Sequence, residues 1–222
     1  VSEFVRFHPI FDNAKDFSSV YDTTYLRKTV GTKIVPGEDP FQTEFSKSTR
    51  KTIMRALKAG VTYKVTKKPS DISNFIKIYY STMDRNKASD YYYFDRNYFD
   101  NCLKYFHDNI LLIEVEYDNK IIAMGFYFVF NQIIHAHLSG TLTEYATAQW
   151  ASENGIKLIH YGGGTSNSED DSLYKFKKKF TKETEFEFYV GKKIWNTKIY
   201  DELCSITNVD KSTDFFPAYR SK

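Results

Sequence analysis

The sequence predicts a mixed α/β fold whose central sheet is largely antiparallel and flanked by helices. Three apolar, strand-like runs follow one another at Ile110–Tyr117, Lys120–Phe130 and Gln132–Ser139, and polar pairs that favour tight turns separate them. Helical patterns precede and follow this block, unlike the regular alternation of a doubly wound sheet. The 222 residues are enough to form one good core or two small ones.

The N-terminal sixty residues predict two strands and one basic helix. The strands are expected at Val5–Phe11 and Thr29–Val35, and the helix at Phe45–Ala59. Ser46 or Ser48 is expected to cap the start of this helix, because serine is favoured there. Gly60 is expected to end it, because glycine is favoured just after the last helical residue.

Predicted strands and helices continue through the rest of the chain. A strand at Val61–Val65 and two helices precede the three central strands. The first helix carries apolar residues from Ile72 to Met83 on one stripe, with Ser70 and Asp71 as caps, and the second covers Arg96–Phe106.

After the central strands, the pattern predicts a helix at Thr147–Glu153, a buried strand at Lys157–Tyr161 and a helix that begins near Ser172. Strands at Glu183–Val190 and Lys192–Trp195 follow, and then a last helix at Thr197–Ile206. The order from Val61 onward, β, α, α, β, β, β, α, β, α, β, β, matches the order of the GNAT acyltransferase fold.

Composition excludes several classes of protein. The formal net charge of +3 is too small to indicate a nucleic-acid protein without a local basic site. The two cysteines, Cys102 and Cys204, are far apart and are expected to be core thiols. No apolar run approaches the ~20 residues of a membrane span, and the start lacks the order of a secretory signal. We expect a cytoplasmic protein.

The segment Leu173 to Phe180 carries the most chemical information. At helical spacing Leu173, Phe176 and Phe180 form one apolar face, and Lys177 falls on the same side. A lysine held against apolar surface after a glycine-rich strand end is well placed to neutralise a phosphate or an oxyanion. An equally strong alternative is a solvated basic helix whose Lys177 stem lies along the core.

The helix at Phe45–Ala59 carries a second basic feature. Four cations recur at helical spacing with Arg50 alongside: Lys47, Lys51, Arg55 and Lys58. Such a stripe suits a polyanion, although a charged run more often only faces solvent.

Other residues give weaker signals. Gly162, Gly163 and Gly164 favour a turn or a close approach of the backbone to a ligand, but they form no nucleotide-binding motif. His135 and His137 share one strand face without a carboxylate or cysteine at ligand spacing, so no metal is expected.

Several segments together resemble the Fem family of non-ribosomal peptidyltransferases: Phe4–Pro9, Ser46–Lys51, Lys58–Val61, Met83–Asn86, Tyr91–Phe94, His137–Gly140, Tyr161–Gly164 and Ser172–Phe180. The resemblance implies tandem GNAT-like domains, here a partial first domain with the basic connecting helix at 1–60 and a transferase domain at 61–222. It also implies transfer of an aminoacyl group from aminoacyl-tRNA to an amine of a peptidoglycan precursor, with peripheral contact to a lipid-linked substrate as a further expectation.

The resemblance implies roles for particular residues. Phe176 and Lys177 match the family's Phe-Lys pair at the transfer site, where Lys177 assists the tRNA end or the tetrahedral intermediate. Ten more residues are expected to bind substrate: Arg50, Arg85, Tyr92, His137, Ser139, Tyr161, Gly162, Gly163, Gly164 and Tyr174. Transfer from an activated ester to an amine needs no metal and no cofactor.

Two other functions stay open. One is a Fem-like N-acyltransferase that uses an acyl-CoA or carrier thioester on an amino sugar or another small amine, although Ser139 to Ala146 lacks the usual pyrophosphate loop. The other is a non-catalytic domain that binds RNA or an anionic surface. The join between Tyr145 and Thr147 is shorter than the family pattern, so we expect residues to be missing there and at the N-terminus.

Overall fold

The computed structural model describes residues 1–221 and divides the chain into two compact units. The larger unit contains residues 30–162 and 173–184. The smaller unit contains residues 1–29, 163–172 and 185 onward. Strand β2 (Asp22–Lys33) therefore contributes residues to both units.

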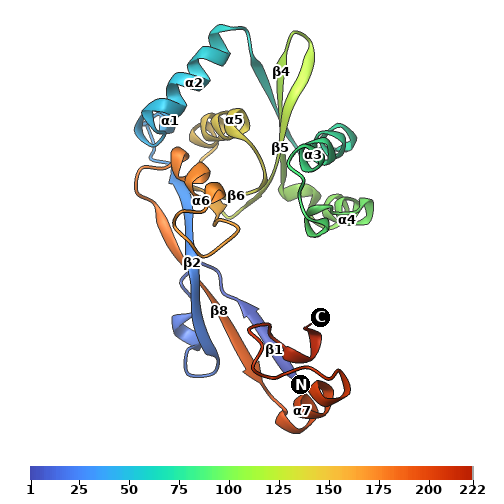
Figure 1. Cartoon of the computed structure of the whole chain (residues 1–222). Helices are drawn as coiled ribbons and strands as arrows, with labels where there is room; N and C mark the ends of the chain where they lie inside the picture. Colours follow the sequence, from blue (N-terminus) through green and yellow to red (C-terminus); the bar gives the residue numbers. More distant parts are fainter. Residues whose placement is uncertain (222) are drawn as a thin grey trace. The chain divides into compact units, whose positions relative to one another are not determined.

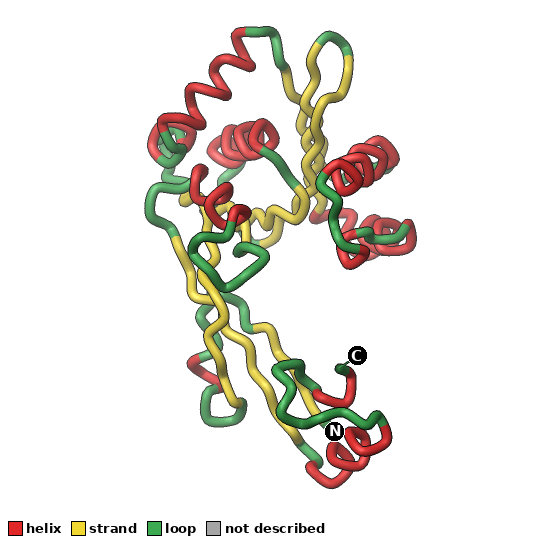
Figure 2. Tube along the Cα trace, viewed as in Figure 1, coloured by secondary structure: helices red, strands yellow, loops and turns green. Residues whose placement is uncertain are grey.

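Seven further strands are present, and Figures 1 and 2 show them as arrows and as yellow tube. They are β1 Ser2–Arg6, β3 Thr62–Lys67, β4 Ile110–Tyr117, β5 Lys120–Phe130, β6 Ile133–Leu138, β7 Leu158–Gly162 and β8 Glu185–Ile194. The predicted bounds of the first two central strands are confirmed to the residue, and those of the third to within one residue at each end.

The sheet of the larger unit has the order β2-β7-β6-β5-β4-β3. All its neighbouring strands are antiparallel except β6 and β7, which are parallel. Two pairs of left-handed residues make the tight turns between β4, β5 and β6, as the sequence predicted: Asp118 with Asn119, and Asn131 with Gln132. The predicted mixed fold, with a largely antiparallel sheet flanked by helices, is confirmed.

The helices are α1 Pro40–Thr43, α2 Lys47–Lys58, α3 Ser73–Arg85, α4 Arg96–Phe106, α5 Thr141–Glu153, α6 Ser172–Lys177 and α7 Thr197–Ile206. A 3₁₀ turn, η4, continues α6 over Lys178–Phe180. The predicted ends of α2 are confirmed: Ser46 Oγ accepts from the Thr49 amide at 3.3 Å, and Gly60 has a φ of +97°.

The two faces of β4 and β5 pack against different helices, because successive side chains of a strand alternate between faces. Leu111, Ile113 and Val115 join a core with the small residues of α5. Ile110 and Leu112 join a second core with α3 and α4. Figure 1 shows α5 on one side of these strands and α3 and α4 on the other.

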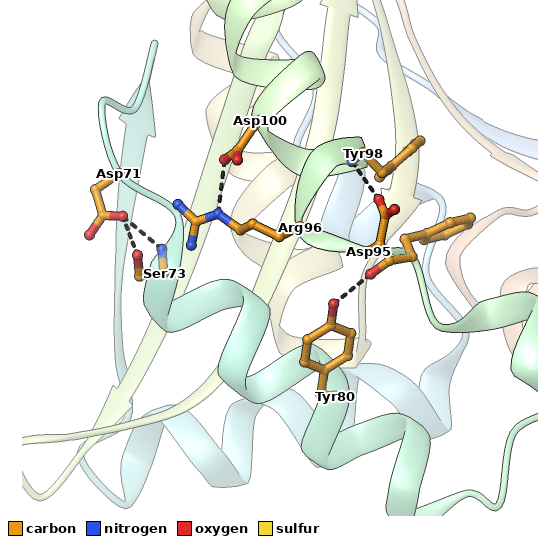
Figure 3. Close-up of polar contacts among 8 residues, drawn as sticks. Asp71, Ser73, Tyr80, Asp95, Arg96, Tyr98 and Asp100 are labelled. Atoms are coloured by element: carbon orange, nitrogen blue, oxygen red, sulfur yellow. Dashed lines mark hydrogen bonds and ion pairs between the residues drawn. The ribbon is translucent and has the colours of Figure 1, made fainter.

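Polar contacts fix the ends of α3 and α4, as Figure 3 shows. Asp71 accepts from both the amide and the hydroxyl of Ser73, at 2.9 and 2.6 Å, and Asp95 accepts from the Tyr98 amide at 2.8 Å. The Tyr80 hydroxyl donates to the Phe94 carbonyl at 2.6 Å, which ties α3 to the segment before α4.

Two predictions about element bounds are wrong. Helix α5 begins at Thr141, not at Thr147, because its buried side chains are mainly threonine and alanine and form no apolar stripe that reveals its start. Strands predicted at Glu183–Val190 and Lys192–Trp195 form the single strand β8. Gly191 does not break β8, since its missing side chain leaves room for the Phe7 ring, 2.7 Å from a β-carbon built there.

The N-terminal strands also differ from the prediction. Strand β1 covers Ser2–Arg6 and ends before Pro9, whose nitrogen cannot donate a ladder hydrogen bond, while the predicted range was Val5–Phe11. Strand β2 starts seven residues before the predicted Thr29. The join between Tyr145 and Thr147 lies inside α5. That residues are missing at this join and at the N-terminus remains an expectation. An intact mass of 26.0 kDa would refute it.

In the smaller unit β1 pairs with β8 in antiparallel register, from Ser2 opposite Ile194 to Arg6 opposite Val190. Its small core gathers Tyr200, Cys204 and Ala218. Both cysteines are buried free thiols, as predicted. No helix within residues 1–221 is long and apolar enough to cross a membrane. The predicted division into domains at 1–60 and 61–222 stays a prediction.

Candidate functional site

The end of β7 brings Gly162 and Lys177 together. Gly162 has a φ of +72°, a conformation that favours glycine, and a β-carbon built on it would lie 3.7 Å from Lys177 Nζ. Lys177 is the last residue of α6 and is half-buried. The predicted association of the glycine turn with this lysine is therefore present in the structure.

The side chains of α6 that are buried differ from those that the helical spacing predicted. Leu173 is 37% exposed, so its predicted place on the apolar face is wrong, and Tyr174 is buried in its stead. The reason is that α6 is short and tightens into η4, where each residue turns by more than the α-helical angle. Phe176 packs on Phe180 with ring centroids 5.1 Å apart and lies against the core, next to the half-buried Lys177 in the chain.

Glu144, in the first turn of α5, is a buried carboxyl with 1% of its surface exposed. The hydroxyl of the exposed Ser139 donates a hydrogen bond to Oε1, while Oε2 has no hydrogen-bond partner within residues 1–221. Burial raises the pKa of Glu144 to about 8, although the Ser139 hydrogen bond and the positive charge of Lys177 oppose this increase. Glu144 can therefore change its protonation state near neutral pH.

Buried hydroxyls line the same region. Tyr127 Oη donates to Thr143 Oγ1 at 3.0 Å, and Tyr161 Oη lies 2.7 Å from Thr32 Oγ1. Thr32 in turn donates to the carbonyl of Phe180. Burial, reinforced by the nearby Glu144, raises the pKa of both phenols well above the ordinary value, so both stay neutral.

This arrangement combines one cation, neutral hydroxyls and one proton-accepting carboxyl around the end of β7. Such a set can stabilise an anion and can accept a proton, which are the two requirements for transfer of an acyl group to an amine. Among residues 1–221 no group of three His, Cys, Asp or Glu is arranged to hold a metal ion.

Three of the predicted substrate-binding residues lie on or near α3, α4 and β6. Arg85 is exposed at the end of α3, and Tyr92 is 39% exposed with its carbonyl accepting from Tyr79. His137 Nε2 lies 2.6 Å from the hydroxyl of Tyr98, and burial lowers the pKa of His137 to about 4. His137 is therefore neutral, and it shares a hydrogen bond with Tyr98.

The remaining predicted residues have contacts within the protein. Arg50 Nη1 donates to the carbonyls of Gln42 and Phe45, at 2.8 and 2.7 Å, and so ties the start of α2 to α1. Gly163 and Gly164 belong to the smaller unit, where Arg27 and Asp171 respectively occupy the space next to their α-carbons. Tyr161 and Tyr174 are buried at 2% and 8% exposure. Their roles in substrate binding stay predictions.

The sequence analysis missed Glu144, Tyr127 and Thr32. One signal was available for the first: Glu144 is the only Asp, Glu, Lys or Arg between Lys120 and Glu153. A single charge in a long apolar stretch is expected to be either exposed at a turn or held inside for chemistry. No local pattern marks Tyr127 or Thr32.

Comparison with known proteins identifies the family. A family model described as FemAB-like, peptidoglycan biosynthesis/recognition, matches residues 17–161. The chain belongs to the FemAB-like family. The matched part of this FemAB-like protein contains Ser139, Glu144 and Tyr161, and it ends just before Gly162.

Relatives support the same placement. The FemAB-like chain is 26% identical over 172 residues to the UDP-N-acetylmuramoylpentapeptide-lysine N(6)-alanyltransferase of Weissella viridescens. This alignment covers 72% of the chain and 50% of the relative, so the chain spans about half the length of that protein.

Two solved structures share the fold. FemX superimposes with a TM-score of 0.67 at 14% identity, covering 90% of this chain and 74% of FemX. The L-PGS protein of Bacillus licheniformis superimposes with a TM-score of 0.58 at 13% identity, covering 91% of this chain and 71% of that one.

Proposed function

We propose that this FemAB-like protein transfers an aminoacyl group from aminoacyl-tRNA to an amine of a peptidoglycan precursor in the cytoplasm. The observation that carries the proposal is the half-buried Lys177 beside Gly162, in a chain related to an alanyltransferase that acts on a lysine of a precursor pentapeptide.

Lys177 has two uses in such a reaction. Its ammonium group can neutralise the phosphate at the tRNA end, or it can stabilise the oxyanion that forms when the amine attacks the ester carbonyl. Phe176, the residue before Lys177, packs on Phe180. A charge that is held in place stabilises a transition state without reorganising during the reaction.

A basic helix face supports RNA as the donor. Lys47, Lys51, Arg55 and Lys58 are all exposed on α2. Their charges can contact phosphates of a polyanion, which makes binding depend strongly on salt concentration. We propose that this face contacts the tRNA.

The experiment measures transfer of radiolabel with the full-length protein. A mixed aminoacyl-tRNA pool and acetyl-CoA are offered separately as donors, and nucleotide-linked and lipid-linked cell-wall precursors are offered as acceptors. We expect label to move from tRNA. The labelled amino acid recovered on the precursor then identifies the transferred group.

Two results would contradict the proposal in different ways. Transfer from acetyl-CoA alone indicates a Fem-like N-acyltransferase that uses a thioester donor. No transfer from either donor, together with salt-sensitive RNA binding, indicates a protein that binds RNA without catalysis.

A further inference from the structure

Glu144 is an unusual residue for the interior of the larger unit. A buried carboxyl is normally paired, because an unpaired polar atom loses its hydration without compensation. Here Oε1 accepts from Ser139 and Oε2 has no hydrogen-bond partner within the described residues. The Tyr127 hydroxyl donates to Thr143 Oγ1, and it lies close enough to Glu144 to favour the charged form of the carboxyl.

Several elements of the larger unit contribute polar groups to the surroundings of Glu144. These groups are Tyr127 on β5, Ser139 after β6, Thr143 and Thr147 on α5, Tyr161 on β7 and Lys177 on α6. Lys177 is the cation in this set, and both tyrosines are neutral because burial raises their pKa. Lys177 therefore acts on the carboxyl with a positive charge, while Ser139 and Tyr127 act on it as neutral hydroxyls.

Ser139 joins this buried carboxyl to the surface. It is exposed at the end of β6, and its hydroxyl donates to Glu144 Oε1. A serine hydroxyl has one proton to donate and lone pairs that accept, so it can receive a proton on its outer side while it releases its own on the inner side. Gly140 and Thr143 fix this corner, since the Gly140 amide donates to Thr143 Oγ1 at 2.9 Å.

We propose that Ser139 and Glu144 form a proton relay for the attacking amine. This inference rests on the proposed function. The amine nitrogen forms a bond to the ester carbonyl carbon and releases one proton to Ser139 Oγ, while the Ser139 hydroxyl proton passes to Glu144 Oε1. The carbon–oxygen bond to the ribose then breaks, and the proton returns along the same path to the ribose oxygen. The products are an amide and a ribose hydroxyl, and both residues are restored.

Ser139 is the group that touches substrate, and Glu144 acts through it. A carboxyl that exchanges its proton near neutral pH suits this role, because proton transfer is most efficient when the pKa of the acceptor lies near the working pH. Lys177 lies near the Glu144 carboxyl. The oxyanion that Lys177 stabilises and the proton acceptor would therefore be at one site.

The test combines a titration with a rate measurement. The titration follows the side-chain carboxyl carbon of Glu144 by NMR in the free protein labelled with ¹³C-glutamate, using Glu144→Gln to assign the signal. We expect titration near pH 8, and a higher midpoint in Ser139→Ala, because the Ser139 hydrogen bond favours the charged form. Titration below pH 5 would overturn the relay regardless of activity.

The rate measurement uses label transfer from the aminoacyl-tRNA pool across the pH range. Ser139→Ala and Glu144→Gln should each lower the rate by about 10²-fold and remove the inflection of the rate near pH 8. Glu144→Asp keeps a carboxyl and should retain part of the rate. Ser152→Ala and Glu153→Gln change exposed residues of the same helix and should leave the profile unchanged. Thermal melting checks that each variant is folded.

The outcomes separate the two proposals. If the wild-type protein transfers label and Glu144→Gln keeps the wild-type pH profile, the relay is wrong and the proposed function stands. If the wild-type protein transfers no label although Glu144 titrates near pH 8, the proposed function is wrong. The relay is then wrong as well, because it was proposed for that reaction.

Discussion

The phenolic oxygen of Tyr161 lies 2.7 Å from Oγ1 of Thr32, and Thr32 donates its own hydrogen bond to the carbonyl of Phe180. The three residues belong to β7, β2 and η4. Phe180 also contacts Phe176, the residue that precedes Lys177. One buried threonine therefore links the strand that ends at Gly162 to the turn that follows Lys177.

Replacing Thr32 by valine should destabilise the larger unit. The change keeps the shape but removes the hydroxyl, so the buried Tyr161 phenol and the Phe180 carbonyl each lose a partner. We expect a loss of about 1–3 kcal/mol in the free energy of unfolding, measured by urea denaturation. Thr62→Val, at an exposed position on β3, is the matched control and should change stability by about 0.5 kcal/mol or less. Equal effects of the two variants would contradict the structural role of Thr32.

Replacing Lys177 by methionine should lower the rate and leave the fold intact. Methionine keeps most of the apolar stem that packs on the core but has no charge. Under the proposed function we expect kcat to decrease by about 10²-fold or more, because the lost charge acts on the transition state.

The control for this change is Lys179→Met, at an exposed position two residues away. Label transfer and thermal melting are measured on both variants. A Lys177→Met protein that melts like the wild type and transfers label at the wild-type rate would end the catalytic assignment of Lys177.

Gly125 on β5 should tolerate no side chain. A β-carbon built on it would lie 2.6 Å from Tyr127 Cε2 and 2.9 Å from Thr143 Cβ, and the fully buried Tyr127 ring has no space to move into. Gly125→Ala should therefore cost about 1–3 kcal/mol in chemical denaturation. Gly140→Ala meets no atom within 4 Å and should cost less than about 1 kcal/mol, the range of a helix-cap preference. A smaller effect at Gly125 than at Gly140 would disprove the close packing around Tyr127.

The protonation of Glu144 should make stability depend on pH. The pKa of Glu144 rises from 4.5 to about 8 on folding, so between these values the folded protein holds a proton that the unfolded chain has released. Stability from this group is fully present below pH 4.5 and is lost as the pH rises through 8, with a slope of about 1.4 kcal/mol per pH unit.

Denaturation of the wild-type protein and of Glu144→Gln at a series of pH values measures this dependence. The difference between the two free energies isolates Glu144, because all other groups titrate alike in both proteins. Parallel curves from pH 5 to pH 8 would mean that Glu144 is not buried as the structure has it.

Local patterns were sufficient for much of the fold. The turn pairs Asp118-Asn119 and Asn131-Gln132 adopt left-handed conformations, and they set the bounds of the three central strands. The capping residue Ser46 and the terminal Gly60 likewise fixed α2. Amphipathic α4 and α7 were predicted to the residue because one face of each is buried and the other is not.

Elements without a local signature were predicted less well. The buried residues of α5 are mainly threonine and alanine, so no apolar stripe marks its start at Thr141. Leu173 was expected to be buried but is exposed, and Tyr174 is buried, in the short helix α6 that continues into η4. Both cases depend on the neighbours that a segment meets after folding.

Patterns of neighbouring residues were sufficient to predict the three central strands, helices α4 and α7, the family resemblance and the position of Lys177 after a glycine turn, since each depends on residues close together in the chain. Only the tertiary structure brought Thr32 to Tyr161 and to Phe180, which are 129 and 148 residues away along the chain. It also buried Glu144 beside Lys177. Burial and pairing change the pKa of a group through distant parts of the chain, and no local pattern records those neighbours.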